Sequence, residues 1–520
     1  MKRTTSVLAA LALVIALAQP ASAKDAFNPD TLPIPQNSAV FQIGETGVTL
    51  NSSGLGATAR NGQDQWACTS TKDPECAMSK VSFIRGTGIL PVCSSDSDTN
   101  CVVSLEVAAS EAEFEKATFV RYAGGTTFPE DQSVGFFEQV TPSLWDAKNA
   151  PTEGGSTSYA VIVAVNQTRE PRQSSFETES FIANVFPYRE QKSERAKAPY
   201  QFTLEGVSPV TGRVGKSLAG GGGGYDCGWV EDGTCGVVQD FKDGTRVKLT
   251  IRISKQVGGW FQGRIKNPQI SVRDFSPTHN EVSVEAEPAI VQRLHYVVEN
   301  AKDITPEERR LVNGFAGSWE GFVTWANSSN QTGFDYVRYF KPKTGDKAAG
   351  KNTFWNFASS FGVGQGSRCL ADTTKVLGIV TTNAMVYDGG VPKFSRGFLN
   401  YKVAGLHLEA DGVTEVIGSY DLVMRSDVAR CLYGFSRAPV SATITSPGEG
   451  DRSIATTIVG ERNGWLKLAA YGFTFSQKTI QVRITQPRRS TITCVSNTTP
   501  TRTTKVSGIN PKCPTGFRKR

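Results

Sequence analysis

The residues best suited to chemistry are ten cysteines with regular spacing. Three pairs share a separation of eight positions, and two pairs are wider. The pairs are Cys68 and Cys76, Cys93 and Cys101, Cys227 and Cys235, Cys369 and Cys431, and Cys494 and Cys513. Cysteines eight apart can face each other across two antiparallel strands, whose facing Cα atoms lie about 4.5 to 5.5 Å apart, within the disulfide range. The even count and the spacing predict disulfides rather than reactive thiols.

Connectivity is not fixed by spacing at every position. Among the first four cysteines, a nested arrangement of Cys68 with Cys101 and Cys76 with Cys93 stays open beside the local one. Cys227 and Cys235 have no other cysteine near them in the sequence, so they are expected to pair with each other. Closing such a short loop contributes roughly 2.5 kcal/mol in the chain-entropy view.

The N-terminus predicts the compartment in which these thiols oxidise. Lys2 and Arg3 precede an apolar run over 7–18, and the small residues Ala21 and Ala23 follow it. This is the pattern of a cleavable secretory signal peptide, with cleavage after Ala23. The apolar run is shorter than the roughly 20 residues that span a bilayer. We therefore expect an extracellular or cell-wall-associated protein with no transmembrane segment in the mature chain.

Charge is concentrated at the C-terminus. The chain has a net charge of +7, with +2 in the signal segment and +9 in residues 481–520, which contain no Asp or Glu, so residues 24–480 carry −4. Exposed cations without acidic neighbours attract anionic polymers, and salt weakens that attraction. Anionic cell-wall polymers or surface glycans are the expected partners, and nucleic acid is not. The candidate contacts are Arg488, Arg489, Arg502, Lys505, Lys512, Arg518, Lys519 and Arg520.

Two weaker patterns could bind other ligands. Trp260 and Phe261 with Arg264 could form an aromatic platform for a sugar, although ordinary core packing explains the same residues. Asp96 and Asp98 resemble the first ligands of a calcium loop, but Cys101 takes the place of the required glycine and no glutamate closes the loop. We predict a solvated turn there and assign no metal ligand, and a loose surface calcium site stays open as the alternative.

Catalytic and cofactor-binding motifs are not found in the sequence. The three histidines are far apart, and neither HExxH nor CxxC occurs. The segment 212–217 (GRVGKS) lacks the first glycine of a phosphate-binding loop, because that position is Val210. We therefore assign no catalytic, metal or cofactor-binding residue and expect no cofactor.

The elements that hold these residues are predicted to be mainly strands. Apolar and polar residues alternate over 247–253 and 480–484, as in half-buried strands, and 159–165 reads as a fully buried strand. Asp-Gly pairs at 232, 243, 388 and 411 predict turns. A helix is expected from Thr305 to about Gly314, with a capping box closed by Glu308, and a weaker one over 110–116. The fold class is all-β, as several β-sandwich modules of immunoglobulin-like or jelly-roll-like type with one or two short helices.

The length gives a soft expectation of about three domains. The charged, non-periodic segment 189–199 predicts a linker. We expect the following units: 1–23 signal peptide, 24–190 first β-rich domain, 200–300 second, 301–436 third with an N-terminal helix, 437–486 small β module and 487–520 basic tail with a disulfide.

The tail resembles a short basic C-terminal element of many exported actinobacterial proteins. Its TCV start and CPTGF end carry the match, at Cys494, Cys513, Pro514, Gly516 and Phe517. The stretches 241–272, 419–444 and 463–486 look like uncharacterised actinobacterial surface or secreted proteins. The resemblance implies lineage and location and assigns no activity.

Two function hypotheses follow. The first is a non-enzymatic structural, adhesive or ligand-binding protein of the cell envelope or extracellular space, retained partly by its basic tail. The second is a secreted carbohydrate-active enzyme or carbohydrate-binding protein that uses dispersed carboxylates or the Trp260 region.

Overall fold

The structure is a computed structural model of the chain. It describes residues 26–27, 32, 35, 37–45, 53–60, 62, 65–192, 205–207, 214–216, 227–231, 233–312, 322–359, 368–372, 374–396, 398–434, 441–445, 456–475, 478–485, 490–498, 502–508 and 511–520. The predicted signal peptide and the segment 217–226 lie outside the described residues.

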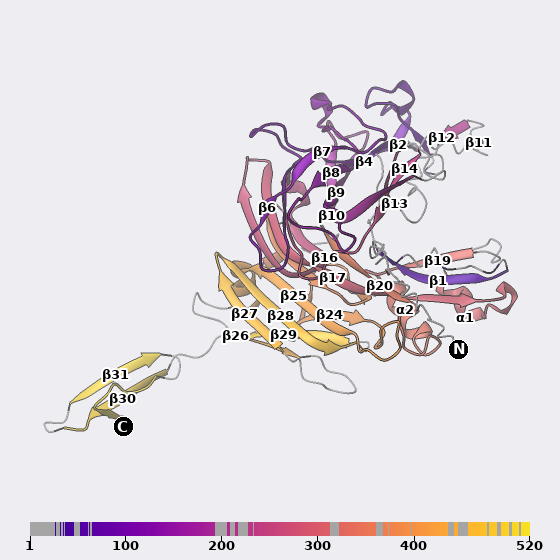
Figure 1. Cartoon of the computed structure of the whole chain (residues 1–520). Helices are drawn as coiled ribbons and strands as arrows, with labels where there is room; N and C mark the ends of the chain where they lie inside the picture. Colours follow the sequence, from indigo (N-terminus) through magenta and orange to yellow (C-terminus); the bar gives the residue numbers. More distant parts are fainter. Residues whose placement is uncertain are drawn as a thin grey trace, which may run out of the picture.

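The expected all-β class is confirmed: strands dominate the described residues, and several separate sheets form. Most strands join one connected hydrogen-bonded network (Figure 1). Its members are β2 (Gly54–Ala59), β3 (Gln65–Ala67), β4 (Val81–Ile89), β5 (Cys101–Ala108), β6 (Glu115–Lys116), β7 (Thr118–Tyr122), β8 (Ser143–Asp146), β9 (Ser158–Arg169), β10 (Glu177–Lys192), β13 (Cys227–Glu231), β14 (Thr234–Val238), β15 (Arg246–Ser254), β16 (Gly259–Asp274), β17 (His279–Arg293), β20 (Gly350–Ser359), β21 (Val376–Thr382), β25 (Ile417–Arg425), β27 (Thr456–Arg462) and β28 (Trp465–Thr474).

Smaller sheets complete the fold. They are β18 (His295–Val298), β1 (Ala39–Gly44) and β19 (Phe322–Asn327); β22 (Val386–Tyr387), β24 (Phe398–Ala404), β29 (Lys478–Thr485) and β26 (Ser441–Thr445), with β23 (Lys393–Ser395) beside β24; β11 (Glu205–Val207) with β12 (Val214–Lys216); and β31 (Thr503–Gly508), β30 (Ser490–Ser496) and β32 (Phe517–Lys519). The last of these sheets lies apart from the rest of the described chain in Figure 1.

The strand predictions match the structure closely. The alternating run 247–253 lies in β15, and its apolar side chains Val247, Leu249 and Ile251 are all fully buried. The run 480–484 lies in β29. The run 159–165 lies in β9, and the side chains of 159–165 are all buried. Period-two alternation places one face of a strand in the core, so the pattern identifies the strand and its inner face together.

Apolar faces of different sheets pack against each other in layers. One core cluster combines Tyr401 of β24, Tyr420 of β25 and Phe473 of β28, so it fills the space between the small sheet and the large network. The largest cluster gathers side chains from β5, β9, β10, β15, β16, β17 and β20. Face-to-face packing of this kind is the sandwich arrangement expected from the sequence.

Three α-helices occur within the described residues: α1 (Pro306–Leu311), α2 (Gln331–Phe340) and α3 (Ser426–Tyr433). The predicted capping box is present, because Glu308 N–H donates to Thr305 Oγ1 at 3.2 Å and Thr305 N–H donates to Glu308 Oε2 at 2.9 Å. The helix predicted over 110–116 is wrong. Ser110 has φ of +52°, which a right-handed helix does not allow, and β6 pairs with β5 instead.

The ten cysteines form five disulfides in the local arrangement, so the nested alternative is not adopted. Five disulfides indicate an oxidising environment outside the cytoplasm. Within the described residues, no helix is both long and apolar enough to cross a membrane.

The domain borders stay a prediction. Strands on either side of them are hydrogen-bonded to each other: β5 pairs with β15, β10 with β20, and β16 with β21. The first residues of the predicted linker, 189–192, belong to β10 and pair with β14.

Candidate functional site

The C-terminal sheet has one strongly cationic face. Its central strand β30 pairs antiparallel with β31 and with β32. Lys505 lies opposite Thr493, Arg518 lies opposite Val495, and Arg520 donates its backbone N–H to the Thr493 carbonyl. Paired residues of neighbouring strands share a face, and residues two apart on one strand also share it. Lys505, Arg518 and Arg520 therefore stand side by side, and we call them the cationic face.

Burial supports this division into two faces. On β31, residues 503, 505 and 507 are exposed, and residues 504 and 506 are half-buried. Thr491 and Ser507 lie 2.6 Å apart, oxygen to oxygen, on the exposed side. The cationic face therefore carries hydroxyl groups beside its three charges, and both kinds of group can donate hydrogen bonds to an anion.

The opposite face of the same sheet is closed by a disulfide. Cys494 is fully buried and is bonded to Cys513, and their Cα atoms are 5.6 Å apart. Arg502 and Lys519 belong to this side, since Arg502 accepts a backbone hydrogen bond from Ser496 and Lys519 lies opposite Cys494. The disulfide takes the place of a hydrophobic core in a sheet too small to have one.

All six predicted tail cations in the described part are exposed: Arg502, Lys505, Lys512, Arg518, Lys519 and Arg520. None of the ion pairs found in the described part of the chain involves them. Arg488 and Arg489 lie outside the described residues. The sequence identified the cations, but only strand pairing shows which three share a face.

The predicted sugar platform is wrong. Trp260, Phe261 and Arg264 are all fully buried, so they offer no surface to a ligand. Trp260 packs in one core cluster and Phe261 in another, since neighbouring residues of β16 point to opposite faces. Core packing, the alternative reading, is what the structure adopts.

Arg264 is instead the centre of a buried polar network. Its guanidinium donates to both carboxylate oxygens of Glu45, at 3.0 and 2.8 Å, and to three backbone carbonyls at the end of β21 and just after it. It also lies 4.3 Å from the ring centre of Tyr387. Burying a charge is tolerated only with such full pairing, so this network ties β16 to the chain around Glu45.

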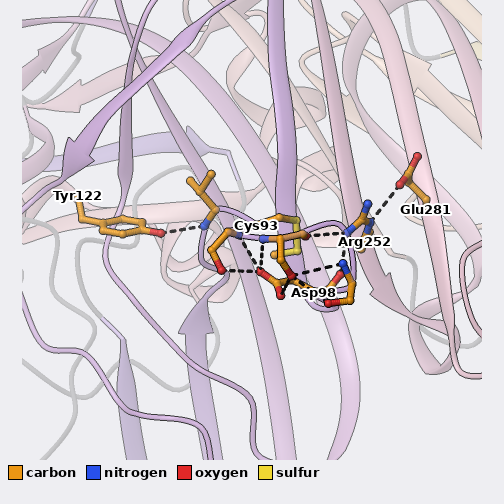
Figure 2. Close-up of a disulfide and its surroundings, with 10 residues drawn as sticks. Cys93, Asp98, Tyr122, Arg252 and Glu281 are labelled. Atoms are coloured by element: carbon orange, nitrogen blue, oxygen red, sulfur yellow. Dashed lines mark hydrogen bonds and ion pairs between the residues drawn. A yellow bond between two sulfur atoms is a disulfide. The ribbon is translucent and has the colours of Figure 1, made fainter.

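Hydrogen bonds to Asp98 also hold together the loop that the Cys93–Cys101 disulfide closes (Figure 2). The Asp98 carboxylate accepts hydrogen bonds from the backbone N–H of Ser94 at 2.7 Å and of Ser95 at 2.9 Å, and from their hydroxyls. These bonds, chiefly those of the hydroxyls, lower the pKa of Asp98 below its usual value. Its oxygens are therefore occupied by the loop itself, which fits the predicted turn.

Arg252 ties this loop to the sheet. It donates to the Asp98 carbonyl at 3.0 Å and to Glu281 Oε2 at 3.1 Å (Figure 2). On the other side of the loop, the Val92 N–H donates to the Tyr122 hydroxyl at 2.8 Å. The interactions are those of a rigid structural turn. In the described part of the chain, no three His, Cys, Asp or Glu side chains cluster closely enough to hold a metal ion.

Among the described carboxyl groups with a clear pKa shift, the buried Asp421 is the one whose pKa is raised. Asp421 of β25 is fully buried, and it accepts hydrogen bonds from the Tyr471 hydroxyl at 2.6 Å and the Asn267 N–H at 3.1 Å. Asn267 lies in a bulge of β16 at φ +57°, and this conformation turns its N–H toward the carboxylate. Burial raises the pKa of Asp421 to about 6.

Two cavities flank this cluster. One, of about 480 Å³, is lined by Tyr471, Lys266 and Glu287 and by the exposed side chains of Ile290 and Ile417. The other, of about 470 Å³, is lined by residues of β16, β17 and the hairpin of β27 and β28. Sequence reasoning missed both, because each is built from strands far apart in the chain. Perturbed groups beside cavities often mark functional sites.

A comparison of the sequence with protein-family profiles and with curated proteins finds no match to either.

Proposed function

We propose that this chain is an exported, non-enzymatic protein of the cell envelope or extracellular space, and that its C-terminal sheet holds it to an anionic polymer. The N-terminal signal pattern and the resemblance to exported actinobacterial proteins support export, and the five disulfides are consistent with it.

A single observation carries the binding part of the proposal. Lys505, Arg518 and Arg520 stand side by side on one open face, and the other face is closed by a disulfide. Neighbouring cations on a flat strand surface suit a chain of repeated anionic groups. The disulfide holds the spacing of the strands, so little ordering is needed when the polymer binds.

The test uses the full chain on immobilised heparin, a polyanionic polysaccharide. We expect Lys505, Arg518 and Arg520 all changed to Gln to weaken binding about tenfold or more near 0.1 M salt, and rising salt to weaken the unsubstituted protein similarly. The control changes Arg502 and Lys519, on the disulfide side of the sheet, and the loop residue Lys512 to Gln, which removes the same charge from the tail without changing the cationic face. An equal loss of heparin binding in both variants would contradict a role for the cationic face.

A second measurement addresses location. Cell fractionation should find the full chain with the envelope, and the chain ending before Pro487 in the medium. Equal release of the two forms would remove the tail from any role in retention.

A further inference from the structure

A groove in residues 24–480, which we call the body of the chain, presents an aromatic side chain between two cations. We call it the Trp465 groove, after the first residue of β28. It has a volume of about 470 Å³ and lies between the β27–β28 hairpin and the edge of β16. This is within the range of small-ligand sites, which is about 300 to 1,000 Å³.

Strand register places the key side chains on one wall. Arg462 of β27 lies directly opposite Trp465, and Lys467 follows Trp465 by two residues, so all three share a face of the hairpin. Trp465 is half-buried against the main core cluster while it lines the groove. One part of the indole is therefore held by the core, and another part is open to a ligand.

A glycine keeps the space beside the indole empty. Gly460 lies opposite Lys467 on the same face, and a Cβ atom built there would meet nothing within 4 Å. Its φ is not in the left-handed region, so backbone conformation does not require a glycine there. The groove extends over this position.

The facing wall is polar. Lys248, Glu285 and Gln269 lie in one register row across β15, β17 and β16, and Ser283 and Ser271 lie in the next row. Gln269 donates to Glu285 at 3.2 Å, and Lys248 pairs with Glu106 at 3.0 Å. The groove is thus lined by hydroxyl and amide groups that can both donate and accept hydrogen bonds, and also by the apolar residues Ile270 and Val423.

The two cations beside Trp465 lack carboxylate partners. In the described part of the chain, neither Arg462 nor Lys467 forms an ion pair. The Lys467 ammonium contacts the Asn267 side-chain carbonyl and lies 3.4 Å from the Pro268 carbonyl. Burial lowers the pKa of Lys467, while Asp421, Glu287 and Glu285 act on it only from a distance. An anionic group in the groove would supply the missing partner.

These observations together specify one ligand chemistry. We infer that the Trp465 groove binds a sugar that carries a carboxylate, with its apolar ring face stacked on Trp465 and its carboxylate between Arg462 and Lys467. A sugar ring has an apolar face that packs on an indole and hydroxyls that both donate and accept hydrogen bonds, which matches both walls. The site is separate from the cationic face of the tail and does not depend on it.

The experiment measures calorimetric binding of three short acidic sugars by the full chain: trigalacturonate, 3′-sialyllactose and a hyaluronan tetrasaccharide. We expect at least one to bind with submillimolar Kd. Lactose, the neutral counterpart of sialyllactose, and maltotriose should bind at least about tenfold more weakly. Absence of binding by all three acidic sugars at millimolar concentration, or equal affinity for the neutral ones, would overturn the inference.

Three variants locate the site. Trp465→Ala removes the stacking surface, and Gly460→Leu places an apolar side chain in the open space beside it. Each should lower affinity about tenfold or more. Val413→Ser, at a residue 81% exposed and outside the groove, should change nothing. Full affinity in both groove variants would exclude this site.

The tail variant separates this inference from the proposed function. The chain with Lys505, Arg518 and Arg520 changed to Gln should bind the short acidic sugars unchanged. Loss of their binding in that chain would assign it to the tail and overturn the groove.

Discussion

Among single residues, Asp421 is unusual because its carboxyl group is fully buried. It is an acidic side chain with no exposed area, held by one hydroxyl and one backbone N–H rather than by a cation within ion-pair distance. Desolvation disfavours the carboxylate more than these two hydrogen bonds favour it, so the pKa of the folded protein is raised from 3.8 to about 6. The raised pKa makes stability depend on pH in a defined direction.

Below about pH 4, Asp421 is protonated in both the folded and the unfolded chain. Between about pH 4 and pH 6, only the unfolded chain loses the proton, so the free energy of unfolding falls as pH rises and levels off above pH 6. We predict that Asp421→Asn lacks this component. Relative to the unsubstituted protein, the variant should gain up to about 3 kcal/mol between pH 4 and pH 6.5. Urea unfolding of the variant and of the unsubstituted protein across this pH range measures the difference in their free energies of unfolding.

Tyr471→Phe provides the control, because it removes one hydrogen bond to Asp421 without removing the carboxyl group. The pH dependence should remain and extend to higher pH, since loss of this donor raises the pKa of Asp421 further. Parallel stability curves for Asp421→Asn and the unsubstituted protein would contradict a raised pKa.

At the scale of elements, the sheet of β30, β31 and β32 has a disulfide and very little apolar burial to stabilise it. Its strands pair only with each other, and Cys494 is its one buried side chain within the described residues. Three short strands with so little apolar burial are marginally stable. A disulfide that closes a loop of this length contributes roughly 3 kcal/mol, about as much as the sheet needs.

We predict that Cys494→Ser together with Cys513→Ser unfolds this sheet alone. Backbone amides of β30, β31 and β32 should lose protection from hydrogen exchange, while the main thermal transition stays in place. The matched control replaces Cys68 and Cys76, which pack inside a core cluster. That pair should lower the main transition temperature and leave the tail protected. A shift of the main transition by the tail substitution would contradict the prediction.

The sequence predicted individual elements well and their partners poorly. The period-two alternation of β15 and the capping box of α1 are local patterns, and local chemistry decides them. Strand partners are set by packing across long separations. Trp260 and Arg264 looked like a surface platform because Glu45, which buries Arg264, is 219 positions away. The Trp465 groove was missed for the same reason, since its two walls come from strands nearly 200 residues apart.

For the whole molecule, strand pairing bears on how the body unfolds. Strands of the predicted first domain pair with strands of the second and third: β5 with β15, and β10 with β20. The largest core cluster also draws side chains from all three segments. A segment cut at a predicted border would expose unpaired strand edges and half of a shared core.

We therefore predict one cooperative unfolding transition for the body, not three. Scanning calorimetry of the chain ending before Pro487 should give equal calorimetric and van't Hoff enthalpies, because the predicted domains share hydrogen-bonded strands and the largest core cluster. Residues 24–190 made separately should lack near-ultraviolet circular dichroism and exchange their amides rapidly. Separate transitions, or a folded 24–190 fragment, would show that the borders read from the sequence divide independent domains. Shared strands and a shared core make the single transition the expected result.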